Sequence, residues 1–197
     1  MTTTRTLLAL LFALTLGACG APPPDSASSA TSTAAPAPAA TVKAESPSRD
    51  TSQTMARDDG YGDMRFGMDE AAFRAAWKGE LQGRSGQTCF YLWPKWVKVP
   101  SDFAFMFEHG RFVRYDVGTA KQTAPGGGQV GMSADRIRKL YPEAAEQPHK
   151  YVPGGKYLRV EHPGGKGVLV FEVGADGKVS HWHAGVPPQV DYVEGCS

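Results

Sequence analysis

Two stretches of this chain repeat each other at a constant spacing, and this duplication constrains the fold more than any other feature of the sequence. The matched positions are Phe66 with Val130, Gly67 with Gly131, Met68 with Met132, Asp69 with Ser133, Phe73 with Ile137 and Trp77 with Tyr141, each pair 64 residues apart. Self-similarity at a fixed period indicates two copies of one supersecondary unit. We therefore expect the same local structure to occur twice.

Each matched stretch predicts the start of a short helix. Asp69 and Ser133 have side-chain oxygens that accept hydrogen bonds from free N–H groups of a first helical turn. The apolar residues before and after each cap have the spacing of a hydrophobic staple. We expect the first helix to end near Lys78 and Gly79, and the second at Tyr141, just before a proline.

Alternating apolar residues predict β-hairpins after each helix. His109 and Gly110 form a predicted two-residue turn between strands at 103–108 and 111–118, and the turn at 174–177 connects strands at 167–173 and 178–185. Further strands are expected at 89–93, 157–161 and 190–193. The predicted fold is α+β, with two repeated helix-plus-antiparallel-sheet units in one domain, repeat 1 at about 62–120 and repeat 2 at about 128–197.

The doubled pattern of a Gly-Met pair, a capped helix, a Cys-containing or aromatic strand and a Gly-containing hairpin resembles the tandem repeat of β-lactamase inhibitory proteins. One unit alone is similar to a small lipoprotein of the outer-membrane β-barrel assembly machinery. Segments 60–68, 148–151 and 187–196 also resemble a group of uncharacterised proteobacterial envelope lipoproteins that often carry the label lectin. These resemblances imply binding of proteins or glycans and no catalysis.

The first residues have the pattern of a lipoprotein export signal. Arg5 precedes an apolar run at 7–14 that is too short to span a bilayer, which takes about 20 residues. Leu16, Gly17, Ala18 and Cys19 follow as a lipobox, so we expect cleavage after Ala18 and acylation of Cys19. Gly20 stands where Asp would retain a Gram-negative lipoprotein in the inner membrane, which implies the outer membrane.

Composition divides the remainder into a linker and one domain. Residues 19–57 are rich in Pro, Ala, Ser and Thr, which predicts a disordered tether, and residues 58–197 make the folded domain. Cys89 and Cys196 are the cysteines left after Cys19, and in an oxidising envelope compartment they are expected to form a disulfide. The 21 basic and 20 acidic residues of the chain argue against nucleic acid as a partner.

Signatures of catalysis and cofactor binding are lacking in the sequence. No Gly-x-Ser-x-Gly elbow occurs, and Ser180 and His181 would point to opposite faces of a strand. The glycines at 126–128 lack the Lys-Ser/Thr ending of a phosphate loop. We therefore expect no enzyme and no cofactor.

Two histidines raise a metal hypothesis. His181 and His183 share one face of a strand, with His109 and His162 as candidate third ligands. No Cys or closely spaced acid completes the set, so we assign no metal site and keep His181 and His183 only as candidates.

Aromatic residues are the favoured ligand-binding groups. Flat rings with a polar edge suit both sugar faces and protein hot spots. The predicted ligand-binding residues are Tyr91, Trp93, Trp96, Tyr115 and Trp182. The sequence predicts a non-catalytic, lipid-anchored envelope protein that binds a glycan, with a protein-binding module (an inhibitor of a secreted enzyme or an outer-membrane assembly factor) as the alternative.

Overall fold

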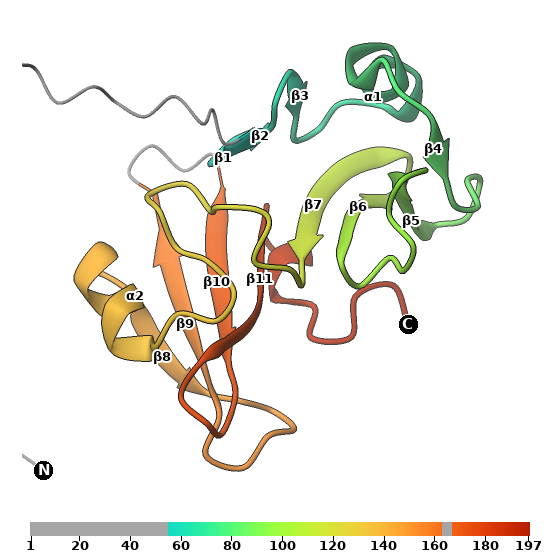
Figure 1. The fold of residues 1–197 in the computed structure, drawn as a ribbon. Helices are drawn as coiled ribbons and strands as arrows, with labels where there is room; N and C mark the ends of the chain where they lie inside the picture. The colour runs from blue at the N-terminus through green and yellow to red at the C-terminus, as the bar shows by residue number, and fades with distance from the viewer. Residues whose placement is uncertain (1–54, 163–166) are drawn as a thin grey trace, which may run out of the picture. The chain divides into compact units, whose positions relative to one another are not determined.

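A computed structural model describes residues 55–162 and 167–197 of the chain (Figure 1). The predicted signal peptide, Cys19 and all but the last residues of the predicted linker lie outside the described residues. Ala56 and Arg57, at the predicted end of that linker, already belong to a strand. None of the helices in the two described ranges is long and apolar enough to cross a membrane.

Most of the described chain is β-structure. Eight strands form one antiparallel sheet in the order β4-β5-β6-β7-β11-β10-β9-β8 (Figure 1). Their bounds are β4 Leu81–Gln82, β5 Cys89–Pro94, β6 Phe103–Glu108, β7 Arg111–Val117, β8 Ala145–Pro148, β9 Lys156–Glu161, β10 Val168–Val173 and β11 Val179–Gly185. A smaller sheet contains β1 (Ala56–Arg57), β2 (Gly60–Tyr61) and β3 (Met64–Arg65).

The predicted α+β fold of two helix-plus-sheet units is wrong. β7 and β11, one from each expected unit, pair directly through the partners Val117 with Trp182 and Asp116 with His183. This pairing joins all the long strands into one sheet, because the return strand of each hairpin has an edge whose N–H and C=O groups need partners. The helices contribute only 8 and 7 residues, so the fold is mainly β.

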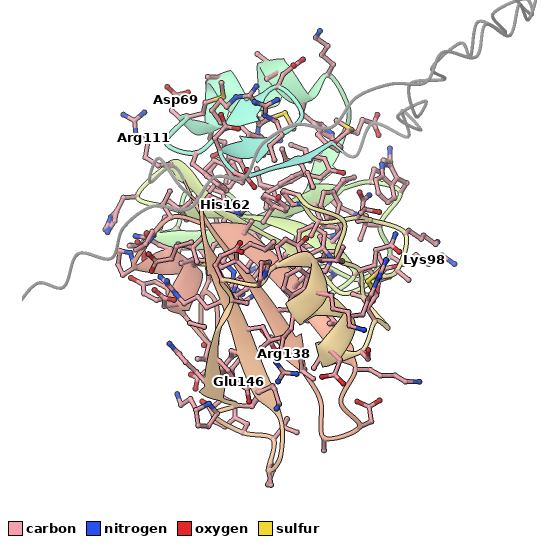
Figure 2. All side chains as sticks on the ribbon, turned by 90° about the vertical axis from the view of Figure 1, so that its left-hand side faces the viewer. Asp69, Lys98, Arg111, Arg138, Glu146 and His162 are labelled. Carbon is pink, nitrogen blue, oxygen red and sulfur yellow. A yellow bond between two sulfur atoms is a disulfide. The ribbon has the colours of Figure 1, made fainter. Side chains whose placement is uncertain are left out.

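The helix caps are confirmed. In α1 (Glu70–Trp77), Asp69 accepts a hydrogen bond from the backbone N–H of Ala72. In α2 (Ala134–Leu140), Ser133 accepts from the N–H of Arg136. Both cap residues also form isolated bridges, Asp69 to Arg111 at the start of β7 and Ser133 to Lys178 just before β11, and Asp69 lies beside Arg111 in Figure 2.

The core lies on one face of the large sheet. Phe73 of α1 packs against Phe105, Phe107 and Phe112, with ring centroids 4.8 to 5.0 Å apart. Tyr141, which follows α2, packs against Phe171. Arg138 of α2 also forms an ion pair with Glu146 of β8, the edge strand (Figure 2). Both helices thus pack on the apolar face that strand alternation creates.

The chain after β11 covers part of the opposite face. We call residues 186–197 the C-terminal strap. The strap contains a short 3-10 helix, η1 (Gln189–Asp191), so the strand predicted at 190–193 is wrong. Val190 of η1 is 1% exposed and packs with Val168 and Val170 of β10. This apolar contact holds the strap against the sheet.

The predicted disulfide between Cys89 and Cys196 is present and ties the end of the strap to β5. Replacing Cys196 with Ser should lower the free energy of unfolding by about 4 kcal/mol, because the bridge closes a long loop in the unfolded chain. Urea unfolding of the variant and of the reduced wild type should give the same loss. Ser197→Ala is the matched control, and a loss of under about 1 kcal/mol for Cys196→Ser would contradict this expectation.

Candidate functional site

Trp96 is the most exposed tryptophan that the structure describes. It follows β5 and is 65% exposed. Its ring lies nearly parallel to that of Phe103, with centroids 6.2 Å apart and an interplanar angle of 16°. Phe103 is itself buried in the core, so one face of the indole rests on a fixed support while the other faces solvent.

Trp77, at the end of α1, lies near Trp96. Its ring makes an edge contact with Phe105 of the core at 5.2 Å, and part of the side chain remains accessible. Gly79 makes room for this ring, since a Cβ at that position would be 2.7 Å from Trp77 Nε1. The sequence indicated Trp77 only as the repeat partner of Tyr141 and not as a ligand-binding residue. One signal in the sequence could have indicated that Trp77 is also accessible to a ligand. Trp77 lies at a helix end, two residues before a glycine.

Trp77, Trp96, Gly79, Glu80 and Lys95 line a groove of about 490 Å³, which we call the tryptophan groove. Glu80 and Lys95 form an exposed ion pair at 2.5 Å. The loop that carries Trp96 is braced by Gln82, whose side-chain amide donates to the carbonyl of Val97 at 2.9 Å. The groove therefore combines two indole rings with one exposed carboxylate and one exposed ammonium.

Two of the predicted ligand-binding residues are core residues. Tyr115 and Trp182 are both 0% exposed and contact each other edge to face, with centroids 5.7 Å apart. The Tyr115 hydroxyl donates to the carbonyl of Arg57. Neither side chain is accessible to a ligand, because strand alternation points both into the core. Their assignment to a binding surface was wrong.

Tyr91 and Trp93 lie apart from the tryptophan groove. On β5 they alternate with the buried residues Phe90, Leu92 and Pro94, and Trp93 is a partly buried residue that packs against the core cluster. The Tyr91 hydroxyl is 3.7 Å from the sulfur of Met106, and burial raises the pKa of that hydroxyl. The structure therefore brings Trp96 together with Trp77, and not with the other predicted aromatic residues.

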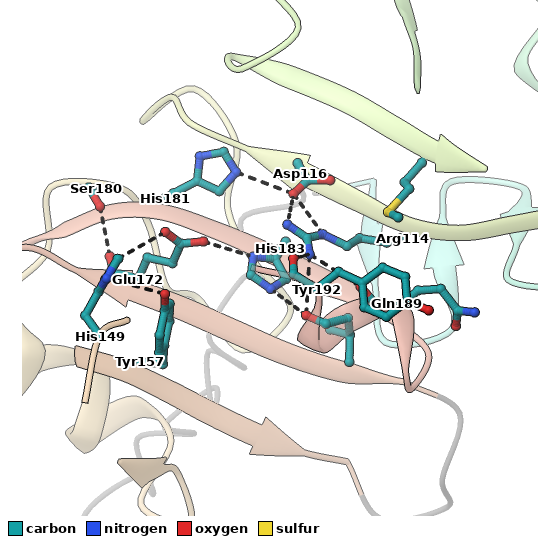
Figure 3. A network of polar contacts seen from close by, with 12 residues as sticks. Arg114, Asp116, His149, Tyr157, Glu172, Ser180, His181, His183, Gln189 and Tyr192 are labelled. Atoms are coloured by element: carbon teal, nitrogen blue, oxygen red, sulfur yellow. Dashed lines mark hydrogen bonds and ion pairs between the residues drawn. The ribbon is translucent and has the colours of Figure 1, made fainter. Parts of the chain in front are cut away.

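The histidine pair lies in a polar network on the strap-covered face (Figure 3). His181 Nε2 is 3.7 Å from Asp116, whereas His183 Nε2 is 2.9 Å from the carbonyl of Val190. The two side chains thus have different partners. Within residues 55–162 and 167–197, no group of three His, Cys, Asp or Glu side chains is arranged to hold a metal ion.

Arg114 and Asp116 form a buried ion pair at the centre of this network. Arg114 Nε donates to Asp116 at 2.9 Å, and its Nη1 donates to the carbonyl of Tyr192 in the strap at 2.7 Å (Figure 3). Burial raises the pKa of the Asp116 carboxyl, but the Arg114 charge and the neighbouring His181 side chain outweigh it, so the pKa lies well below its usual range. Burial, followed by the Arg114 charge, lowers the pKa of His183.

Comparison with known proteins assigns no family. No family model and no curated protein sequence matches the chain. A solved structure of an extracellular protein containing a SCP domain, from Bacillus anthracis, is similar over 61% of this chain, with 11% identity and a TM-score of 0.40. The match covers 44% of that protein, so the chain spans less than half of its length.

Asp116→Asn should lower the free energy of unfolding at pH 7 by about 3 kcal/mol, because it leaves the Arg114 charge buried without a partner. The wild type should lose stability below about pH 6.5, where unfolded histidine takes up a proton that folded His183 does not. It should lose more below about pH 4, where unfolded Asp116 takes up a proton that the folded carboxylate resists. Asp116→Asn should lack only this second loss.

Urea unfolding between pH 3 and pH 8 measures both effects. Glu143→Gln, at an exposed position, is the matched control. Parallel stability curves for wild type and Asp116→Asn below pH 4 would contradict the assignment of the acid-dependent loss to Asp116.

Proposed function

We propose that this protein is a non-catalytic, lipid-anchored carbohydrate-binding protein of the cell envelope, and that the tryptophan groove holds the glycan. The observation that carries the proposal is the stacking of exposed Trp96 on buried Phe103, at a ring separation of 6.2 Å. A solvent-facing ring fixed from behind is a preorganised platform. A flat sugar face can therefore stack on it with little loss of side-chain entropy.

The polar groups of the groove match the needs of a sugar ring. Sugar hydroxyls both donate and accept hydrogen bonds, and Glu80 supplies an acceptor while Lys95 supplies donors. Both side chains are 71% exposed, so either can reorient toward a ligand at small cost. The open shape of the groove suits one or two sugar units of a longer chain.

Export and anchoring are part of the proposal. The lipobox at 16–19 supports acylation of Cys19, and the disulfide supports an oxidising compartment. Multiple acyl chains make membrane attachment durable.

Trp96→Ala should weaken glycan binding at least tenfold, because hot-spot aromatic residues contribute about 2 kcal/mol or more. Binding is measured on oligosaccharide and peptidoglycan-fragment arrays. Val99→Ala, an exposed apolar residue outside the groove, is the control. Val99→Ala should melt like the wild type, and Trp96→Ala should melt somewhat lower but in one cooperative transition, because it uncovers one face of Phe103 and leaves the rest of the core intact.

Equal glycan binding by Trp96→Ala and wild type would remove the groove from the proposal. If no array glycan binds and an envelope protein is captured in a Trp96-dependent manner, the protein-binding alternative replaces the glycan.

Cys19→Ser should abolish palmitate incorporation and move the protein from the membrane fraction to the periplasmic fraction. Cys89→Ser is the matched control, and it should keep the label because the proposed acceptor thiol is intact. Labelled Cys19→Ser protein would disprove lipidation at this residue.

A further inference from the structure

A second cavity lies beneath the C-terminal strap. It is over strands near the opposite end of the large sheet from β4 and β5. This strap cavity has a volume of about 90 Å³. Its lining residues are Gln147, Tyr157, Arg159, Val170, Glu172, His183, Val190, Asp191, Tyr192 and Val193. Gln147, Asp191 and Val193 are exposed, so the cavity is accessible from that side.

His149 lies beside this cavity, next to Glu172 and Tyr157 (Figure 3). Hydrogen bonds fix the position of its ring hydrogen, because Nδ1 accepts from the backbone N–H groups of Tyr151 and Val152, at 3.1 and 3.2 Å. This nitrogen therefore carries no proton, and the hydrogen of the neutral ring is on Nε2. Nε2 is 3.6 Å from one carboxylate oxygen of Glu172. His149 thus presents an N–H to that oxygen.

His183 has the opposite arrangement. Its Nε2 is 2.9 Å from the carbonyl of Val190, and a carbonyl only accepts, so Nε2 carries the hydrogen. Because burial and the Arg114 charge lower its pKa, the ring is neutral and Nδ1 has a free lone pair. This Nδ1 is fully buried without a hydrogen-bond partner and faces the second oxygen of Glu172 at 3.6 Å.

Two acceptors therefore face each other at the wall of the strap cavity. A distance of 3.6 Å is too long for a hydrogen bond, and neither atom has a proton to give. The nearby cations are already paired, Arg159 with Asp191 at 3.0 Å and Arg114 with Asp116. A group that enters here must supply several donors and a positive charge.

An ammonium ion meets these requirements better than a metal ion does. Metal sites of the zinc type need three or four ligands, and in the part of the chain that the structure describes no three His, Cys, Asp or Glu side chains are grouped to hold a metal ion. An ammonium has three donors on one small atom. Val170, Val190 and Val193 in the lining suit the carbon atoms next to that nitrogen.

We propose that the strap cavity binds a primary ammonium group, held between His183 Nδ1 and the carboxylate of Glu172, with its alkyl carbons against the valines of β10 and the strap. This site is separate from the tryptophan groove. It does not depend on the glycan proposal, since the two share no lining residue.

The test uses the full chain titrated with ethylammonium chloride, with sodium chloride at equal ionic strength as the blank. The ¹⁵N resonance of His183 Nδ1 should shift as this nitrogen accepts a hydrogen bond. Ethanol, a neutral molecule of similar size, should cause no such shift. Nα-acetyl-lysine amide tests whether the ammonium group can come from a lysine side chain or only from a small amine. A shift with both amines shows that a lysine side chain fits. A shift with ethylammonium alone shows that only small amines fit.

Glu172→Gln should weaken ethylammonium binding by about tenfold or more, because it removes the charge but keeps the size of the side chain. Glu143→Gln, outside the cavity, should bind like the wild type. The proposal is overturned by equal shifts with ethanol and ethylammonium, by a response to Zn²⁺ alone, by no shift at all, or by wild-type affinity in Glu172→Gln.

Discussion

The pairing of β7 with β11 is the contact on which the rest of this structure depends. It aligns Asp116 with His183 and Val117 with Trp182, so it determines the neighbours on both faces of the sheet. On the core face it brings Trp182 against Tyr115. On the other face it places the charges of β7 beside the histidines of β11. Without this pairing the sheet would end in two exposed strand edges.

Arg114 connects this pairing to the C-terminal strap. Its guanidinium is buried, which is costly unless all its donors are used. Asp116 neutralises the charge, and carbonyls of the strap accept the remaining bonds, including that of Tyr192 at 2.7 Å. The strap is therefore held by three different interactions: the buried guanidinium, the apolar contact of Val190, and the disulfide to Cys89. Because each acts at a different point, the roof of the strap cavity has a defined position.

Local signals in the sequence predicted local structure well. The caps Asp69 and Ser133 and the turn at His109 and Gly110 need only neighbouring residues, and all three are present. The pairing of β7 with β11 joins residues some 65 positions apart, and no local pattern specifies it. The same limit explains why Tyr115 and Trp182 were predicted as ligand-binding residues although they lie in the core. Alternation gives the side chains that share a face, but only the tertiary fold decides which face the helices cover. Trp77 was missed because a helix-end ring can pack and remain accessible at once.

The two proposed sites use different physical means, and their places in the sheet explain why. The tryptophan groove lies by β4 and β5, at one edge of the sheet order, where a loop leaves Trp96 in water on a buried ring. Solvent weakens ion pairs there, so ring stacking must supply most of the affinity. The strap cavity lies over β9, β10 and β11, where burial removes competing water from His183. Electrostatic attraction is stronger in such surroundings, so one carboxylate and one lone pair suffice to select a small cation.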